Sequence, residues 1–221
     1  MADLGCVVFD LDDTLFLEHD YVRSGFEAVA RFLDEERGPT PFFDLAWAAF
    51  ESGARGRIFD ETLAACGIAP TRRLVDSLVD VYRSHEPSLG LLADAETVIA
   101  SLGARPGIAM AVVSDGPLKS QRAKAGAVGA NRWSALTVLT ADLPAGLQKP
   151  SPRPFELVQD ATGRRGASCL YVADNPAKDF VGPKQLGWRT FRVRRPGSLH
   201  EAIDSGDDVD VEAKDLSSLR D

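Results

Sequence analysis

The run Cys6-Val7-Val8-Phe9 is continuously apolar and stops abruptly at a group of acidic residues. Such a run, with no polar alternation, is typical of a parallel strand that is buried on both faces of its sheet. Four later segments are also predicted to be strands, at 108–113, 136–139, 169–172 and 188–193. A chain with these strands must cover both faces of the sheet with helices to exclude water from it.

Helical segments lie between the predicted strands. Asp94 is a suitable N-cap for a helix that runs to about Leu102, and Gly103 follows as its stop signal. Ser151 precedes a proline at the first position of another helix, which Gly163 ends. The alternation predicts an α/β fold with a doubly wound, Rossmann-like parallel sheet of at least five strands. In such sheets, ligands bind beyond the carboxyl ends of the strands.

The segment from Leu15 to about Gly90 interrupts the alternation. Apolar residues recur there at helical spacing in four places, near 22–33, 42–50, 58–66 and 74–82. We therefore predict two domains, a Rossmann-like core of residues 1–15 and 91–221 and a small helical-bundle cap of residues 16–90. The acidic tail beyond Ser198 has no assigned function, although 209–212 has the pattern of a short edge strand before a terminal helix.

Composition limits the classes of protein to which this chain can belong. Its 221 residues are 44% hydrophobic and 26% charged, which is enough for an ordinary globular core. No apolar stretch is long enough to span a membrane, and a net charge of −8 disfavours nucleic acid as a partner. Cys6, Cys66 and Cys169 form no CxxC pair, which indicates a reducing compartment. We expect a cytoplasmic monomer or homodimer.

Three acids follow the first predicted strand. Asp10 and Asp12 lie two residues apart, so their side chains share one face if the chain stays extended, whereas Asp13 points elsewhere. Taken alone, acids at the end of a strand also occur in ordinary turns. Because neighbouring carboxylates repel one another, a positive partner must lie close to this group.

Polar residues at the ends of later segments supply possible partners. Ser114 offers a hydroxyl donor, and Asp115 and Gly116 after it offer backbone N–H groups that suit a phosphate. Lys149 stands just before a predicted helix, where its ammonium group and the helix N-terminus both favour an anion. Each of these residues alone would also suit an ordinary turn or a solvated surface.

Asp174 and Asp179 follow the fourth predicted strand, and Mg²⁺ prefers such carboxylate oxygens as ligands. They complete an ordered set, which is Asp10-x-Asp12-x-Thr14, Ser114, Lys149 and Asp174-x-x-x-x-Asp179. The set resembles the four signature motifs of the haloacid dehalogenase-like hydrolase superfamily. The helical insertion between the first two motifs resembles the subgroup with an α-helical cap. One departure is Ala173, because many relatives have glycine at this position.

The resemblance implies how the acids act. Asp10 would be the nucleophile that forms an aspartyl-phosphate. Asp12 would protonate the leaving alcohol and then deprotonate the attacking water. Magnesium would be bound by Asp10, the backbone carbonyl of Asp12 and Asp174. Asp179 would bind the metal through water or support another ligand, and the spacing leaves both possibilities open.

The remaining motif residues are implied to bind the phosphoryl group. Ser114 and Lys149 would contact its oxygens, assisted by backbone N–H groups near Asp115 and Gly116. Thr14 would orient the turn that carries the acids. Together these roles describe a magnesium-dependent phosphatase that hydrolyses a small phosphorylated metabolite.

Asp12 separates some of the activities known in the family, but not all of them. Dehalogenase relatives lack this second acid and need no metal, so its presence favours phosphoryl transfer. A phosphomutase would use the same residues and return the phosphoryl group to a sugar. A signalling module that only accepts phosphate is a third possibility, although receiver domains lack a large helical insertion after the first strand.

The cap is expected to select the substrate by closing over the site. Basic residues of the insertion are the candidates for contacts with substrate, namely His19, Arg23, Arg55 and Arg57. The segment with Arg55 and Arg57 contains two glycines, which suits a specificity loop and an ordinary turn equally well. Sugar phosphates, phosphoglycolate and nucleotides all stay open as substrates.

Overall fold

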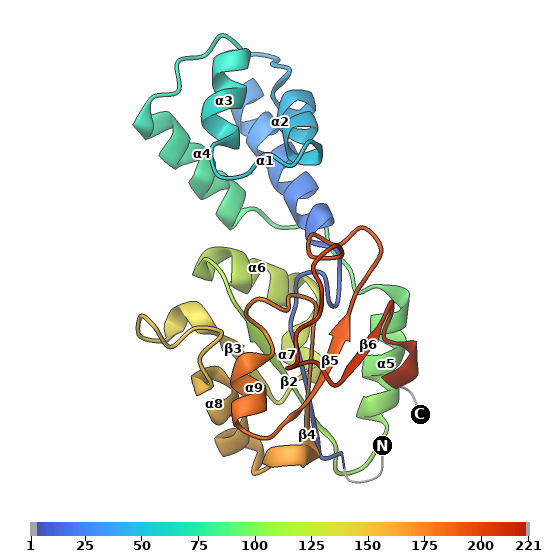
Figure 1. Cartoon of the computed structure of the whole chain (residues 1–221). Coiled ribbons are helices and arrows are strands. Elements are labelled where there is room, and N and C mark those ends of the chain that lie inside the picture. The colour runs from blue at the N-terminus through green and yellow to red at the C-terminus, as the bar shows by residue number, and fades with distance from the viewer. Residues whose placement is uncertain (1–3, 220–221) are drawn as a thin grey trace. The chain divides into compact units, whose positions relative to one another are not determined.

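The computed structural model describes residues 4–219 (Figure 1). The outer ends of the predicted core domain, residues 1–3 and 220–221, lie outside this range. The chain divides into two compact units. One combines the residues up to His19 with those from Leu89 onward, and we call it the core unit. The other is Asp20–Ser88, which we call the helical unit. The boundaries predicted from the sequence, between residues 15 and 16 and between residues 90 and 91, differ from these by a few residues.

The core unit contains a six-stranded, fully parallel sheet in the order β3-β2-β1-β4-β5-β6. Its strands are β1 (Cys6–Phe9), β2 (Ala109–Ser114), β3 (Leu136–Leu139), β4 (Cys169–Ala173), β5 (Arg189–Val193) and β6 (Val211–Ala213). The predicted doubly wound parallel α/β sheet is confirmed. The sixth strand is the edge strand expected near 209–212, and the helix expected after it is a single 3₁₀ turn at Ser217–Leu219.

Strand order and register fix where a ligand can bind. From central β1 the chain proceeds to β2 and β3 on one side and then crosses to β4 and β5 on the other. The carboxyl ends on either side of β1 form the crevice in which such sheets bind ligands. Phe9 is in register with Val112 of β2 and Val172 of β4, so the residues that follow these three strands meet at one edge.

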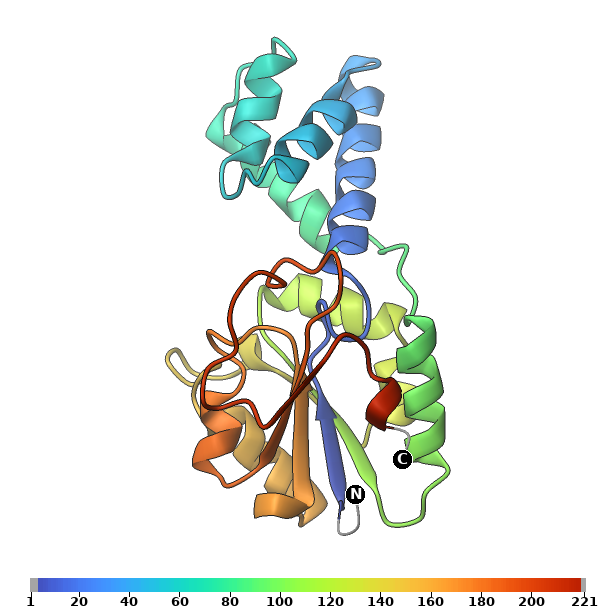
Figure 2. The same ribbon diagram turned by 45° about the vertical axis from the view of Figure 1, so that its right-hand side comes forward.

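Helices cover both faces of this sheet, as the two views show (Figures 1 and 2). They are α5 (Ala93–Gly103), α6 (Leu118–Ala127), α7 (Ala130–Trp133), α8 (Arg153–Thr162) and α9 (Val181–Gln185). On one face, Phe155 and Val158 of α8 pack with the buried side chains of Cys6, Val8 and Tyr171. The continuous apolar strands are therefore buried on both faces by helices, as their pattern predicts.

Two predicted helix starts are corrected by the structure. Helix α5 begins two residues earlier than expected, with Leu92 and not Asp94 at the N-cap. Asp94 lies in the first turn, where its carboxylate accepts the Leu216 N–H at 2.8 Å. Helix α8 has Pro152 at its N-cap, although the Ser151 hydroxyl still accepts the Arg153 N–H at 3.2 Å. Asp94 thus accepts an N–H group from a distant segment, and Ser151 accepts the N–H group of the first residue of α8 from one position before the N-cap.

The helical unit is formed by α1 (Glu18–Arg37, whose first two residues belong to the core unit), α2 (Phe42–Glu51), α3 (Ile58–Ala65) and α4 (Arg72–Ser84). These are the four helices that the apolar spacing predicts. Phe26 of α1 lies at its centre, with the ring centroids of Phe50, Phe59 and Tyr82 at 6.3, 6.0 and 5.8 Å. No helix within residues 4–219 is both long and apolar enough to cross a membrane.

Candidate active site

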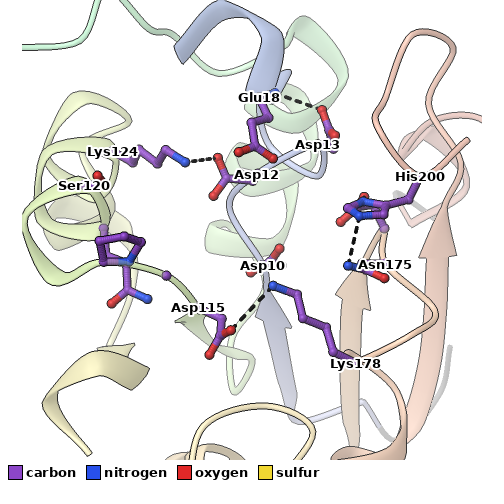
Figure 3. A pocket seen from close by; sticks show the side chains of 14 residues that line it. Asp10, Asp12, Asp13, Glu18, Asp115, Ser120, Lys124, Asn175, Lys178 and His200 are labelled. Atoms are coloured by element: carbon purple, nitrogen blue, oxygen red, sulfur yellow. Dashed lines mark hydrogen bonds and ion pairs between the residues drawn. The ribbon is translucent and has the colours of Figure 1, made fainter. Parts of the chain in front are cut away.

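A pocket of about 160 Å³ opens at the carboxyl edge of the sheet, within the core unit (Figure 3). Its lining combines acids, amides and cations, among them Asp10, Asp12, Asp13, Glu18, Asp115, Gly116, Gln121, Lys124, Asp174, Asn175, Lys178 and His200. Five of the predicted site residues therefore share one cavity, namely Asp10, Asp12, Asp115, Gly116 and Asp174. Three others, Ser114, Lys149 and Asp179, are almost completely buried and do not line it.

Asp10 directly follows β1 and is held by a buried lysine. Its backbone N–H donates to the Val172 carbonyl at 2.9 Å, which continues the sheet register to this residue. Lys149 Nζ donates to Asp10 Oδ1 at 2.9 Å and to Asp179 Oδ1 at 2.6 Å. Burial alone would lower the pKa of Lys149, but the two carboxylates raise it well above its ordinary value. The lysine is therefore a permanent cation behind Asp10.

Asp12 faces a different cation. Its Oδ1 lies 2.6 Å from Nζ of Lys124, which projects from α6 (Figure 3). Burial raises the pKa of Asp12 to about 6, with Lys124 opposing the shift and the Glu18 and Asp10 carboxylates adding to it. A carboxyl with this pKa exchanges its proton close to neutral pH, as a general acid and base must.

Asp13 does not point away from the pocket, contrary to the sequence prediction. The chain stops being extended at this residue, which has a left-handed φ of 52°. Its Oδ1 accepts the Glu18 N–H and its Oδ2 accepts the Leu199 N–H, both at 2.8 Å. Thr14 follows in the same turn, and its carbonyl accepts two bonds from Arg195. These contacts join the turn after β1 to the segment after β5.

Ser114 ends β2 with its side chain fully buried. Its carbonyl accepts from Gln121 Nε2 at 2.9 Å, but its Oγ has no hydrogen-bond partner within the part of the chain that the structure describes. Asp115 accepts from the Thr140 hydroxyl at 2.5 Å and lies 3.5 Å from Lys178 Nζ. Gly116 has a φ of 143°, which strains any residue with a side chain. The Ser114 hydroxyl is thus a buried donor whose hydrogen-bonding capacity is unused in the described residues.

Asp174 follows β4 and completes a cluster of carboxylates. One carboxylate oxygen each of Asp10, Asp174 and Asp179 lie within 4.8 Å of one another. Burial raises the pKa of Asp174 to about 7, and the Asp179, Asp10 and Asp13 carboxylates add to the shift, while a hydrogen bond from His200 opposes it. Burial also raises the pKa of Asp179, against the lowering effect of Lys149.

The basic candidates of the insertion do not line this pocket. His19 is the last residue of the core unit before the helical unit begins. Arg23 pairs with Glu27 at 3.4 Å on the same helix. Arg55 donates to the Phe50 and Ala54 carbonyls at 3.0 and 2.7 Å, which engages its Nη1 within its own loop. Arg57 is the exposed N-cap residue of α3.

Sequence analysis missed several residues that line the pocket. Lys124, Lys178, Asn175 and His200 belong to none of the recognised motif positions. Asn175 and Lys178 lie between Asp174 and Asp179, and this position inside a recognised motif could have identified them as pocket residues. Lys124 and His200 carried no such signal, because the first depends on the direction of α6 and the second on a long irregular segment.

Several known proteins resemble this chain in sequence. The family model described as haloacid dehalogenase-like hydrolase matches residues 4–187. A phosphoserine phosphatase of Thermus thermophilus is 31% identical over 150 residues, which cover 68% of this chain and 58% of that protein. The match thus spans less than two thirds of that relative. A glyceraldehyde 3-phosphate phosphatase of Methanopyrus kandleri is 27% identical over 217 residues, which cover 93% and 89% of the two chains.

Solved structures share the fold at lower identity. A 2-haloacid dehalogenase of Pseudomonas syringae pv. Tomato superposes with a TM-score of 0.66 at 22% identity, covering 98% of this chain and 96% of that one. The fold is thus common to phosphatases and dehalogenases, so the activity must be argued from the site. On its family match and its fold, this chain belongs to the haloacid dehalogenase-like hydrolases.

Proposed function

We propose that the protein is a magnesium-dependent phosphatase that hydrolyses a small phosphate monoester. One observation carries the proposal: Asp10 and Asp12 line the same pocket, the first fixed by Lys149 and the second with a pKa of about 6. A carboxylate nucleophile held by a cation and a neighbouring acid that can give and take a proton are the two groups that the reaction needs.

In the first step, Asp10 attacks the phosphorus atom in line with the ester oxygen. Lys149 donates to Oδ1, whose second lone pair can still face a metal, and we assign the attack to Oδ2. The bond between phosphorus and the ester oxygen breaks as the bond to Oδ2 forms, and Asp12 gives its proton to the leaving alcohol. The products are an aspartyl-phosphate on Asp10 and a free alcohol.

In the second step, Asp12 is ionised and takes a proton from water. The water oxygen attacks phosphorus, the bond to Asp10 Oδ2 breaks, and inorganic phosphate leaves. Asp12 regains the proton that it lost in the first step, so the cycle balances. A pKa of about 6 suits both halves, because neither protonation state is costly near neutral pH.

The donor set fits a magnesium ion. Three carboxylates converge within 4.8 Å, and the raised pKa of Asp174 indicates that its charge lacks compensation. Asp10 and Asp174 would hold the ion together with the backbone carbonyl of Asp12. Both oxygens of Asp179 are engaged, by Lys149 at 2.6 Å and by the Asn175 N–H at 3.0 Å, so Asp179 supports the other ligands. When bound, the ion would neutralise charge on the phosphate and the carboxylates.

The transferring phosphoryl oxygens would be bound by Ser114 and Lys149, and Lys149 would give up one of its bonds to Asp10, Tyr171 or Asp179 to do so. The unpartnered, buried Ser114 hydroxyl supports this role, because a buried polar group normally has a partner. Backbone N–H groups at Asp115 and Gly116 would add donors. We further propose that the helical unit acts as a cap that selects a small phosphorylated metabolite, with His19, Arg23, Arg55 and Arg57 as candidate contacts. The free thiols of Cys6 and Cys169 support a cytoplasmic location.

The test is release of phosphate from an aryl phosphate with and without Mg²⁺. We expect Asp10→Asn to abolish release and Asp12→Asn to nearly abolish it, while Asp160→Asn serves as the matched control. Asp160 is exposed and pairs only at the surface with Arg165. Undiminished turnover by Asp10→Asn would refute the mechanism. Sugar phosphates tested with and without a sugar bisphosphate separate a hydrolase from a phosphomutase, because a mutase releases little phosphate.

A further inference from the structure

We infer that His200 is a positioning residue for Asp174: it holds one carboxylate oxygen so that the other faces the metal. This inference rests on the proposed magnesium site. His200 lies in the irregular segment after β5, and its side chain is 29% exposed at the edge of the pocket. Its Nδ1 lies 2.8 Å from Asp174 Oδ2. No motif of the family match includes it, because that match ends at residue 187.

A chain of hydrogen bonds fixes which ring nitrogen carries the proton. The Ala177 backbone N–H, which can only donate, lies 3.0 Å from Asn175 Oδ1. The amide group of Asn175 is therefore oriented with Nδ2 toward His200 Nε2, at 3.1 Å. Since Nδ2 is a donor, Nε2 must accept, and the ring proton sits on Nδ1. Nδ1 then donates to Asp174 Oδ2.

The same chain of bonds determines what His200 cannot do. Nε2 uses its lone pair on Asn175, and Nδ1 carries a hydrogen, so neither nitrogen is left to bind a metal. The alternative cluster of Asp13, Asp174 and His200 is weakened further, because both oxygens of Asp13 accept backbone N–H groups. His200 therefore acts through Asp174 and does not coordinate the ion.

A buried arginine holds the backbone on both sides of this contact. Arg192 of β5 is fully buried, and its Nε donates to the Asp174 carbonyl at 3.0 Å. Its Nη2 donates to the His200 carbonyl at 2.8 Å, and its Nη1 donates to the Ile203 carbonyl at 2.7 Å. One rigid guanidinium thus fixes the distance between the metal ligand and the residue that orients it.

The test compares metal affinity without turnover, using Mn²⁺ alone as the probe. His200→Phe keeps a ring but removes both hydrogen bonds, and His200→Asn keeps a donor near the position of Nδ1. We expect His200→Phe to weaken Mn²⁺ binding by about 10–100-fold and His200→Asn by only about threefold, as for other residues that orient a metal ligand. Electron paramagnetic resonance of free and bound Mn²⁺ gives the affinities.

Two further measurements separate positioning from other roles. The electron spin echo spectrum of bound Mn²⁺ is expected to show no directly coordinated imidazole nitrogen. The kcat of His200→Phe is expected to recover at saturating Mg²⁺, because only the affinity is impaired. If His200→Phe fails to fold, His200→Ala replaces it, since the backbone carbonyl held by Arg192 is retained.

Several results would overturn the inference. One is a wild-type affinity for Mn²⁺ in His200→Phe or His200→Ala. Another is an affinity of His200→Asn for Mn²⁺ that is no higher than theirs. A third is a directly coordinated nitrogen in the electron spin echo spectrum of bound Mn²⁺. A wild-type protein that binds no Mn²⁺ would refute the metal site and this inference together. Wild-type binding with undiminished activity of Asp10→Asn would refute the proposed mechanism alone and leave the role of His200 intact.

Discussion

Lys124 Nζ lies 2.6 Å from Asp12 Oδ1, and their side chains are only 8% and 20% exposed. The two residues belong to different segments, the turn after β1 and helix α6. This pair counteracts the effect of burial on the Asp12 carboxyl, whose pKa is about 6 with the lysine in place. The contact therefore lowers the pH at which the Asp12 carboxyl exchanges its proton.

Replacement of this lysine should shift the pH dependence of activity. Lys124 lowers the pKa of Asp12, so Lys124→Met is expected to raise that pKa and keep the carboxyl protonated at higher pH. The alkaline limb of kcat/KM, where the acid form is lost, should then move to higher pH. Lys119→Met, an exposed lysine on the same helix, is the control. An unmoved alkaline limb in Lys124→Met would contradict the assignment of Asp12 as the acid.

Magnesium should stabilise the folded protein through Asp174. A ligand that binds only the native state at 100 times its Kd adds about 2.7 kcal/mol to the free energy of unfolding. We expect urea denaturation of the wild type to show a gain of this order on addition of Mg²⁺. Asp174→Ala should lose that gain, and Asp160→Asn should retain it. Equal stabilisation of Asp174→Ala would place the ion elsewhere.

Asp94 should make stability depend on pH in the acid range. Burial opposes ionisation, but the Leu216 N–H and Arg195 lower the pKa of Asp94 below 3.8. Arg195 Nη2 lies 2.9 Å from its Oδ2. The stabilisation is therefore present above the unfolded pKa and is lost as the pH falls through the lower folded pKa.

The measurement is urea denaturation of Asp94→Asn at neutral pH and in acid. At pH 7 the substitution should cost about 1–2 kcal/mol, because it weakens hydrogen bonds to a charged group. Below the folded pKa of Asp94 the difference from the wild type should shrink toward zero. Glu96→Gln, an exposed acid in the same turn, should show neither effect. A cost that did not change with pH would contradict the ionic origin.

Gly25 of α1 should not tolerate a methyl group. A Cβ atom there would lie 2.4 Å from Tyr82 Cε2, and that ring is packed against Phe26 and Phe59. Alanine is favoured over glycine in a helix, but such overpacking costs about 1–3 kcal/mol. We therefore expect Gly25→Ala to lower the free energy of unfolding of the protein in urea.

Gly126 provides the opposite case within α6. Apart from its chain neighbours and its own helix backbone, nothing in residues 4–219 lies within 4 Å of a Cβ atom at this position. Gly126→Ala should therefore stabilise the protein by about 0.4–1 kcal/mol, because alanine favours the helix and leaves the unfolded chain fewer conformations. Opposite signs at the two glycines would show that close packing, and not helix propensity, decides the outcome at Gly25. Stabilisation by Gly25→Ala would mean that the Tyr82 ring moves freely.

Local signals in the sequence were sufficient for the sheet and for the acids at its edge. The run before Asp10 and the runs before Ser114 and Asp174 are short, apolar and followed at once by polar residues, so strand and site position come from the same few residues. Parallel register then brings the strand ends together without further information. The motif acids could therefore be located before any contact was known.

The rest depended on contacts between residues far apart in the chain. The N-cap of α5 was placed wrongly because Asp94 bonds Arg195 and Leu216, more than a hundred residues away. The direction of the Asp13 side chain was predicted wrongly, because the residue has a left-handed φ and its carboxylate accepts the N–H group of the distant Leu199. A pattern within a short window contains no information about such partners.

Because of Arg192, the residues beyond the family match matter when the boundaries of an expressed domain are chosen. The family match ends at residue 187, yet Arg192 joins the Asp174 carbonyl to the segment that carries His200. An expression clone trimmed to the matched residues would keep every motif acid and lose β5, β6 and this arginine. Such a fragment would look complete by motif inspection while lacking part of the framework that holds Asp174.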